Sequence, residues 1–214
     1  MFENKPKLEL IINNIANFGY VVVEDFLPLN IVDNLNKLAK EHYGQNNMQA
    51  AKVGSKIKMQ NSAIRGDSIF WLDENNQNKE IQIYFKEMHE IKQAFNQYLF
   101  LNVHEIEAHF ACYSIGNFYQ KHLDQFSQVS GNQNRQISSV LYLNKDWQAS
   151  NGGELKLYLS EGENRSEIES RSKFINISPN AGRLVLFLSA QFWHEVLPAK
   201  VERLSLTGWF RTRN

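Results

Sequence analysis

The chain has 214 residues, 43% of them hydrophobic and 21% charged, and its 23 basic side chains balance 23 acidic ones. No stretch approaches the roughly 20 consecutive apolar residues of a membrane span, so the composition indicates a soluble globular protein and excludes a transmembrane one. With no net charge there is no field to gather a polyanion, so we expect no nucleic-acid partner. The single cysteine, Cys112, excludes an internal disulfide and an all-thiolate zinc site, so any metal must be held by His and carboxylate side chains.

Residues 1–20 carry charged and amide side chains every few positions. They therefore lack the apolar core and the small-residue cleavage site of a secretion signal. We expect a cytoplasmic protein that folds as a single domain over residues 1–214, with no membrane attachment, and we expect it to be a monomer.

Residues 1–100 are predicted to be mainly helical, because their apolar residues recur at helical spacing. A first helix is expected over 7–18, and Gly19 should end it before a short strand over 20–23. Asn30 is expected to cap a second helix. The inward-facing apolar residues are Ile31, Leu35 and Leu38 in the second helix, and Ile83, Met88, Ile91, Phe95 and Leu99 in a third over 79–100.

A long polar segment separates the second and third helices. Residues 44–63 are rich in Gln, Asn, Lys and Ser and show little periodicity, and a loop of that length inside a compact domain is usually functional or disordered. We interpret residues 44–67 as a lid. The overlapping segment 64–72 is predicted to be a strand.

From residue 104 the pattern changes to short alternating segments, separated by turn signals such as 151–153 and 179–182. About eight strands are predicted, at 105–113, 119–123, 137–143, 154–159, 174–177, 183–188, 193–197 and 203–211, with a polar excursion over 160–172. This pattern predicts an α+β fold. Its core is a double-stranded β-helix, or jelly roll, over residues 104–211, with the N-terminal helices packed against one of its sheets.

His122 and Asp124 lie two residues apart, so on a strand both side chains would leave from the same face. Among six histidines such a pair arises easily by chance, and alone it could be a surface pair. A third candidate ligand, His194, lies in an apolar strand 70 residues after Asp124. Two His and one carboxylate form the facial triad of non-haem Fe(II) oxygenases, although zinc hydrolases use similar ligands.

Arg203 lies on the next predicted strand, nine residues after His194. A guanidinium makes two parallel charge-assisted hydrogen bonds to a carboxylate, and an Arg in an apolar strand requires an anion from the protein or from a ligand. Two-residue alternation divides the strand into two faces, with Arg203, Thr207 and Trp209 on one and Leu204, Leu206 and Phe210 on the other. Arg203 is therefore a candidate clamp for the carboxylate of an organic co-substrate.

Several ordered segments resemble one family. They are 111–113 with His122 and Asp124, then 142–147 (Tyr-Leu-Asn-Lys-Asp-Trp), Gly152-Gly153, His194 to Val196 and Arg203 to Trp209, and residues 64–67 resemble the motif before the family's substrate lid strand. Together they cover residues 60–211. They are similar to the prolyl 4-hydroxylase branch of the Fe(II)/2-oxoglutarate-dependent oxygenases, in particular to the hypoxia-inducible-factor prolyl hydroxylases and their bacterial relatives.

The resemblance implies roles that are carried over position by position. It implies that Fe(II) is bound by His122, Asp124 and His194, that 2-oxoglutarate is bound by Arg203 and Tyr142, with Tyr113 and Thr207 lining its pocket, and that the substrate region includes Arg65, Asp67, Arg135, Tyr119 and Trp209. Closure of the lid could bring Asp67 and Arg135 together, and Trp209 could offer a flat wall for a proline ring, with core packing as the alternative. The other histidines, His42, His89, His104 and His109, are expected to be solvated or structural.

The function that the resemblance implies is hydroxylation, at the 4-position, of a prolyl residue that a protein substrate presents in an extended loop. Dioxygen and 2-oxoglutarate would be consumed and succinate released, with ascorbate as a candidate reductant. A long polar lid suits a partner's backbone better than a small apolar metabolite. Two alternatives stay open: hydroxylation of a free amino acid or another small molecule, and a jelly-roll binding module without turnover.

Overall fold

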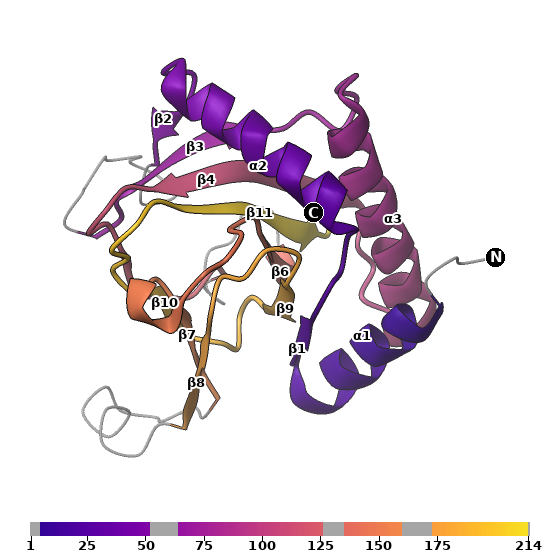
Figure 1. The fold of residues 1–214 in the computed structure, drawn as a ribbon. Helices are drawn as coiled ribbons and strands as arrows, with labels where there is room; N and C mark the ends of the chain where they lie inside the picture. The colour runs from indigo at the N-terminus through magenta and orange to yellow at the C-terminus, as the bar shows by residue number, and fades with distance from the viewer. Residues whose placement is uncertain (1–4, 52–63, 126–134, 160–172, 214) are drawn as a thin grey trace.

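The computed structural model describes residues 5–51, 64–125, 135–159 and 173–213 (Figure 1). The helices are α1 (Lys5–Phe18), α2 (Leu29–Gly44) and α3 (Lys79–Leu99), and a short 3-10 turn covers Ala149–Asn151. The strands are β1 (Tyr20–Val23), β2 (Gln49–Ala50), β3 (Asp67–Trp71), β4 (Glu105–Tyr113), β5 (Tyr119–His122), β6 (Arg135–Tyr142), β7 (Leu155–Tyr158), β8 (Phe174–Ile177), β9 (Leu184–Leu188), β10 (His194–Val196) and β11 (Arg203–Arg211).

The strands form two antiparallel sheets. Seven of them follow the order β1-β9-β6-β11-β4-β3-β2, and four follow the order β5-β10-β7-β8. A hydrophobic cluster joins the sheets face to face, with Val140 and Tyr142 from the larger sheet and Leu155, Leu157 and Val196 from the smaller one. The eight strands β4 to β11 all lie between residues 104 and 211, so the predicted jelly roll is confirmed.

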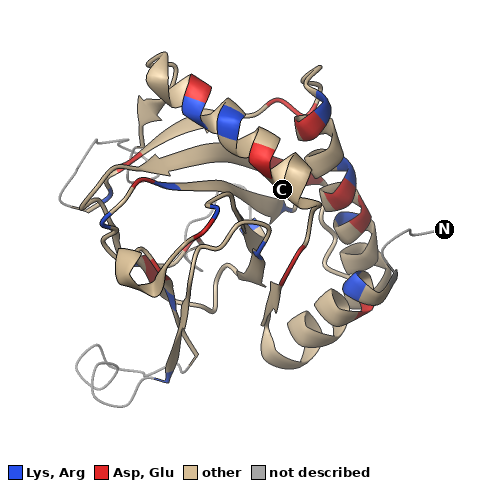
Figure 2. Cartoon of the chain, viewed as in Figure 1, with Lys and Arg blue, Asp and Glu red and all other residues tan. Residues whose placement is uncertain are grey.

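The three helices cover the other face of the larger sheet (Figure 1). Their apolar stripes and the sheet's helix-facing residues form the larger of the two core clusters, in which Phe95 of α3 meets Phe210 of β11 edge to face at 5.2 Å between ring centroids. Acidic and basic residues are interspersed along α2 and α3 (Figure 2). No helix within the described ranges is both long and apolar enough to cross a membrane.

The predicted cap at Asn30 is wrong, because the N-cap of α2 lies two residues earlier in the chain. The backbone N–H groups of Ile31 and Val32 both donate to the carbonyl of Pro28, which is the N-cap residue and makes no side-chain cap. Pro28 has φ −55° and ψ 138°, the extended conformation usual for an N-cap residue, and its side chain carries no polar atom that could cap the helix. The side-chain cap occurs instead at α3, where Asn78 accepts hydrogen bonds from the N–H groups of Glu80 and Ile81.

The buried stripe of α3 is rotated relative to the prediction. Met88, Ile91 and Phe95 are buried as expected, whereas Ile83 and Leu99 are only partly buried at the edge of the core. Their places in the core are taken by Ile81, Tyr84 and Phe85. Residues three and four apart share a helix face, and Ile83 lies two residues from Ile81, so the two cannot face the same way.

The segment interpreted as a lid lies largely outside the described residues, which resume at residue 64 after residue 51. Its two ends are tied to the edge of the larger sheet, because β2 pairs with β3 through Gln49 and Ile69. The strand expected over 64–72 is shorter, since β3 begins at Asp67 and Arg65 makes an isolated bridge to Tyr119. The polar excursion over 160–172 also lies outside the described residues.

Strand register stacks the pocket-facing side chains of the larger sheet in rows. From one end to the other, Arg203 lies opposite Tyr113, Ser205 between Ala111 and Tyr142, Thr207 between His109 and Val140, and Trp209 between Glu107 and Ser138. Alternate residues point to opposite faces of a strand, so all of these side chains face the smaller sheet. The rows place an arginine at one end of the space between the sheets and a tryptophan at the other.

Candidate active site

His122, Asp124 and His194 meet between the two sheets. β5 and β10 pair antiparallel with His194 directly opposite His122. Asp124 Oδ1 lies 3.6 Å from His122 Nε2, and Asp124 Oδ2 lies 3.7 Å from His194 Nε2. One ligand atom from each residue falls within 4.8 Å of the others, and across the described ranges no other group of His, Cys, Asp and Glu side chains could hold a metal in this way.

The local geometry of Asp124 differs from the prediction. β5 ends at His122, so Asp124 lies in the bend that follows and does not share a strand face with His122. It is held by the larger sheet, because Ser138 Oγ donates to Asp124 Oδ2 at 2.6 Å and Trp209 Nε1 donates to the same oxygen at 2.9 Å. Tertiary hydrogen bonds, and not strand alternation, bring the carboxylate to the histidines.

Both histidines present Nε2 to the centre. The backbone carbonyl of Gln120 lies 2.7 Å from His122 Nδ1, and that of Phe192 lies 3.0 Å from His194 Nδ1. A carbonyl only accepts, so each Nδ1 carries a hydrogen and each Nε2 is the ring nitrogen left to face a metal. Burial, reinforced by the charge of His122, lowers the pKa of His194 to about 4, so this ring is neutral at pH 7 and ready to bind a metal.

The carboxylate of Asp124 is prepared to bind through one oxygen. Burial alone would raise its pKa, but His194 and His122 outweigh burial and hold the pKa well below the ordinary value, so the group is ionised. Ser138 Oγ also lies 2.8 Å from Ser189 Oγ, and since Ser138 donates to Asp124, Ser189 donates to Ser138. With Oδ2 occupied by two donors, Oδ1 is the oxygen left for a metal.

A buried cation without a counter-charge lies in the same pocket. Arg203 is 1% exposed, its Nε donates to the carbonyl of Gly153 at 2.9 Å, and no carboxylate of the described residues forms an ion pair with it. The Tyr142 hydroxyl beside it is buried and has no hydrogen-bond partner among those residues. Burial raises the pKa of Tyr142 although Arg203 opposes the shift, so the hydroxyl keeps its proton. A guanidinium and an orphaned O–H donor together fit a ligand carboxylate.

Ten of the twelve predicted site residues line a single pocket, and Tyr142 and Arg135 are the other two. The Asp67–Arg135 pair is not formed. Arg65 donates to Asp67 through Nε at 2.5 Å and Nη2 at 2.8 Å, whereas Arg135 pairs with Glu107 at 2.8 Å. The Arg65 and Asp67 side chains are two residues apart and reach each other without any closure.

Two guanidinium groups lie over aromatic rings of the predicted substrate region. The guanidinium of Arg65 lies over the Tyr119 ring at 4.7 Å, and that of Arg135 lies over the Trp209 ring at 3.5 Å. Trp209 is 4% exposed and bonds Asp124 through its indole N–H, so it supports the metal ligand as well as lining the pocket. The sequence prediction missed this hydrogen bond.

His109 was expected to be solvated or structural, but it is 1% exposed and lines the same pocket. The signal was present in the sequence, because two-residue alternation on β4 puts His109 on the face of Tyr113. Ser138, which holds Asp124, was missed in the same way, since it lies four residues before Tyr142 on β6.

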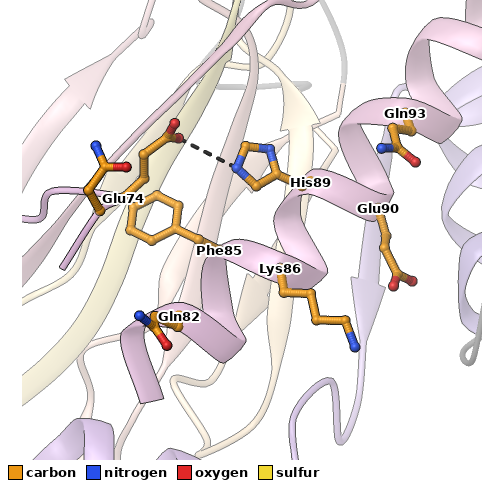
Figure 3. Close-up of a pocket in the computed structure, with 8 residues that line it drawn as sticks. Glu74, Gln82, Phe85, Lys86, His89, Glu90 and Gln93 are labelled. Atoms are coloured by element: carbon orange, nitrogen blue, oxygen red, sulfur yellow. Dashed lines mark ion pairs between the residues drawn. The ribbon is translucent and has the colours of Figure 1, made fainter. Parts of the chain in front are cut away.

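A second hollow lies between α3 and the loop that carries Glu74 and Asn75 (Figure 3). Its ion pair joins His89 Nε2 to Glu74 Oε2 at 3.5 Å, with the two side chains 36% and 47% exposed. Exposed ion pairs contribute little to stability, and this hollow has neither convergent metal ligands nor a buried charge among its lining residues. The chemistry is therefore concentrated between the sheets.

Comparison with known sequences places this chain beside oxygenases. The family described as the 2OG-Fe(II) oxygenase superfamily matches residues 108–211. Human Egl nine homolog 1 is 27% identical over 212 residues, covering 96% of this chain and 47% of the relative, and mouse prolyl hydroxylase EGLN3 is 25% identical over 213 residues, covering 96% and 84%. The chain spans about half the length of the Egl nine homolog 1 proteins that it matches.

Solved structures give the same picture. A Pseudomonas putida prolyl-4-hydroxylase is 37% identical, with a TM-score of 0.83, and the match covers 97% of this chain and 100% of the other. A prolyl hydroxylase from Trichoplax adhaerens, solved with a peptide fragment of hypoxia inducible factor, is 24% identical with a TM-score of 0.80, covering 98% and 90%. At that identity the second likeness shows a common fold.

Proposed function

This chain belongs to the 2OG-Fe(II) oxygenase superfamily, and we propose that it hydroxylates a prolyl residue of a protein substrate. The observation that supports the proposal most strongly is a single pocket in which a His-Asp-His cluster lies beside a buried, uncompensated arginine. A metal alone would not require the arginine. A carboxylate co-substrate that also reaches the metal accounts for both.

We propose that Fe(II) is held by the Nε2 atoms of His122 and His194 and by Oδ1 of Asp124. The donor set fits, because both Nδ1 atoms are occupied by backbone carbonyls and Oδ2 of Asp124 is occupied by Ser138 and Trp209. Two imidazoles and one carboxylate oxygen leave coordination positions for a co-substrate and dioxygen.

We propose that the far carboxylate of 2-oxoglutarate is held by Arg203 and by the Tyr142 hydroxyl, with Tyr113 and Thr207 as walls. The Nε of Arg203 is committed to Gly153, which fixes the plane of the guanidinium and leaves its terminal N–H groups for a forked contact. The tyrosine adds a neutral donor without adding a second charge. The co-substrate's charge compensates for the buried cation, so binding should also stabilise the fold.

When bound, Fe(II) with 2-oxoglutarate and dioxygen supplies the oxidising power to convert a C–H bond into C–OH, with release of succinate and carbon dioxide. The protein's own residues orient the metal ligands and the bound molecules, and they exclude water. His122, His194 and Asp124 are each at most 14% exposed at the side chain, so water has little access to the centre. Trp209 and Ser138 fix the carboxylate before any ligand arrives, which avoids reorganisation during the reaction.

The proposed substrate is a protein that presents a proline in an extended loop, near Arg65, Asp67, Tyr119, Arg135 and Trp209. The relatives named prolyl hydroxylases support this substrate class. Trp209 offers an apolar ring beside the metal ligands, and Arg135 lies over it. We also propose hydroxylation at the 4-position, a cytoplasmic location, a monomeric state and ascorbate as a reductant.

The proposal is tested with the purified protein, Fe(II), 2-oxoglutarate and an extract of host-cell proteins. Mass spectrometry should find a peptide in which a proline has gained one oxygen atom, and its appearance should require both 2-oxoglutarate and intact His194. Succinate formation with free proline or another small molecule, but without any hydroxylated protein, would overturn the protein-substrate proposal. No iron-dependent succinate under any condition would favour a binding module.

A further inference from the structure

One buried polar atom in the active-site pocket has no assigned role. His109 on β4 lies opposite Thr207 of β11 and Trp71 of β3. Its ring lies 4.9 Å from the Trp71 ring and 5.5 Å from the Trp209 ring, measured between centroids. The His109 Nε2 atom is buried and has no hydrogen-bond partner among the described residues. Leaving such an atom unpaired costs stability, so a partner is expected when the pocket is filled.

The protonation state of the ring decides what that partner can be. His109 Nδ1 lies 3.1 Å from the carbonyl of Phe110, which can only accept, so Nδ1 carries the hydrogen. Burial, followed by the charge of Arg65, lowers the pKa of His109 to about 4, so a second proton is absent at pH 7. Nε2 is therefore a buried, unpaired hydrogen-bond acceptor on a ring that lines the pocket.

An acceptor does not suit the other occupants of this pocket. Ionised 2-oxoglutarate has only acceptor oxygens, and dioxygen has no donor. His109 is not part of the cluster that could hold the metal. Of the molecules that the proposed reaction brings into this pocket, only the primary substrate can supply a hydrogen-bond donor. Trp71 of the same row is 50% exposed, so this end of the row reaches the surface.

Within a prolyl substrate the choice of donor is narrow. The target proline has no backbone N–H, but the residues on either side of it do, and these N–H groups are rigidly connected to the ring that must reach the metal. An N–H that enters a dry pocket needs an acceptor. We propose that His109 is a specificity-determining residue that accepts a hydrogen bond from the backbone N–H of a residue adjacent to the target proline. This inference rests on the proposed function.

The test uses a peptide that the wild-type enzyme hydroxylates, synthesised as the amide and in two forms in which one flanking N–H is replaced by an ester oxygen. Three variants are compared with the wild type: His109→Met, which keeps the volume without an acceptor, His109→Gln, which returns an acceptor oxygen, and His104→Met as an exposed control. In the wild type, one ester should lower kcat/KM roughly 5- to 30-fold. With the amide peptide, kcat/KM of His109→Met should be lower than that of the wild type by the same factor. Replacing the amide by the ester should then cause no further decrease in His109→Met. His109→Gln should recover part of the lost kcat/KM with the amide peptide.

The co-substrate separates this role from a structural one, because the KM for 2-oxoglutarate should stay the same in His109→Met. A higher KM for 2-oxoglutarate, or an ester effect that persists in full in His109→Met, would overturn the inference while leaving prolyl hydroxylation intact. If the wild type hydroxylates no prolyl peptide, the proposed function fails and the inference fails with it.

If His109→Met does not fold, nitrogen NMR of the His109 ring in the wild-type protein, with Zn(II) in place of iron, tests the hydrogen bond directly. The amide peptide should shift the Nε2 resonance and the matching ester should not, and equal shifts would contradict the proposal.

Discussion

The two sides of the seven-stranded sheet are made from the same strands but have different chemistry. On β11, Leu204, Leu206 and Phe210 enter the core under the helices, whereas Arg203, Thr207 and Trp209 face the smaller sheet and the metal ligands. Neighbouring residues on the strand point to opposite faces, so a residue that packs in the core is followed by one that faces the ligand pocket. Substitutions on the helix side should therefore lower the free energy of unfolding. Substitutions on the pocket side should mainly lower affinity for metal, co-substrate or substrate.

The largest effect is expected at the metal. His194→Ala should lower Fe(II) affinity by more than roughly 100-fold, since even residues that only support a metal ligand usually contribute 10- to 100-fold. The fold should persist, because β10 keeps its pairing with β5 and β7. Metal titration under anaerobic conditions measures the affinity, with His104→Ala as the exposed control. Undiminished iron-dependent turnover in His194→Ala would contradict the assigned ligand set.

Arg203 and Leu204 test the two sides with neighbouring residues. Arg203→Ala removes a forked, charge-assisted contact of about 2–3 kcal/mol, so the apparent affinity for 2-oxoglutarate should fall roughly 30- to 150-fold. Leu204→Ala should leave that affinity alone and lower the free energy of unfolding by about 2–5 kcal/mol, because it opens a cavity in the core. Michaelis constants and urea unfolding measure the two quantities. An unchanged KM for 2-oxoglutarate in Arg203→Ala would reject the clamp.

The pocket side should also make stability depend on pH. The pKa of His109 is about 4 in the folded chain against an ordinary 6.5, so between these values the unfolded state binds more protons. The free energy of unfolding should therefore fall as the pH falls through this window, by about 2 kcal/mol between pH 6.5 and pH 5 for this one group. His109→Met should remove that share. The pKa of His194 is lowered too, but His194 is present in both the wild type and His109→Met. The difference between their urea-unfolding free energies, measured without metal, therefore gives the contribution of His109. Parallel pH profiles for wild type and His109→Met would contradict the assignment.

Two adjacent serines make a matched pair across the sheet. Ser138 faces the pocket and donates to Asp124, whereas Ser139, equally buried, faces the helices. Ser138→Ala should weaken Fe(II) binding about tenfold, because one of the two donors that hold Oδ2 of Asp124 is lost. Ser139→Ala should leave metal affinity unchanged. Equal metal affinity in the two variants would show that Trp209 alone orients the carboxylate.

Local patterns predicted what depends on local periodicity. The eight strands of the jelly roll and the two faces of β11 follow from alternation and spacing within single segments. The triad combines two segments far apart in the sequence, which were matched by residue type and motif order. The resemblance then supplied Tyr142 and Tyr113, which spacing alone would have left as core residues. In the structure the Arg203 guanidinium lies 5.1 Å from the centre of the Tyr113 ring and 5.0 Å from that of the Tyr142 ring.

The remaining features depend on contacts between segments far apart in the sequence. The hydrogen bonds to Asp124 come from β6 and β11, and the partner of Arg135 is Glu107 on β4, so no single window contains either pair. Which side chains meet in these contacts depends on the register between neighbouring strands, and that register is set by the tertiary fold. His109 is different, because alternation on its own strand already placed it beside Tyr113. Its lack of metal-type spacing to the triad gives no sign of a role in ligand binding, so the sequence indicates only a solvated or structural histidine.

The smallest expected effect is at Tyr142. Tyr142→Phe removes a hydroxyl that has no partner until a ligand binds, so the fold should lose little and 2-oxoglutarate affinity should fall roughly fivefold, for about 1 kcal/mol of neutral hydrogen bond. Combining it with Arg203→Ala sharpens the comparison. Both groups contact the same carboxylate in the proposed arrangement, so the double variant should lose less than the product of the two single losses. Losses that multiply fully would mean that the hydroxyl and the guanidinium serve different ligand atoms. A stability loss in Tyr142→Phe as large as that of Leu204→Ala would place the tyrosine with the packing residues of the helix side.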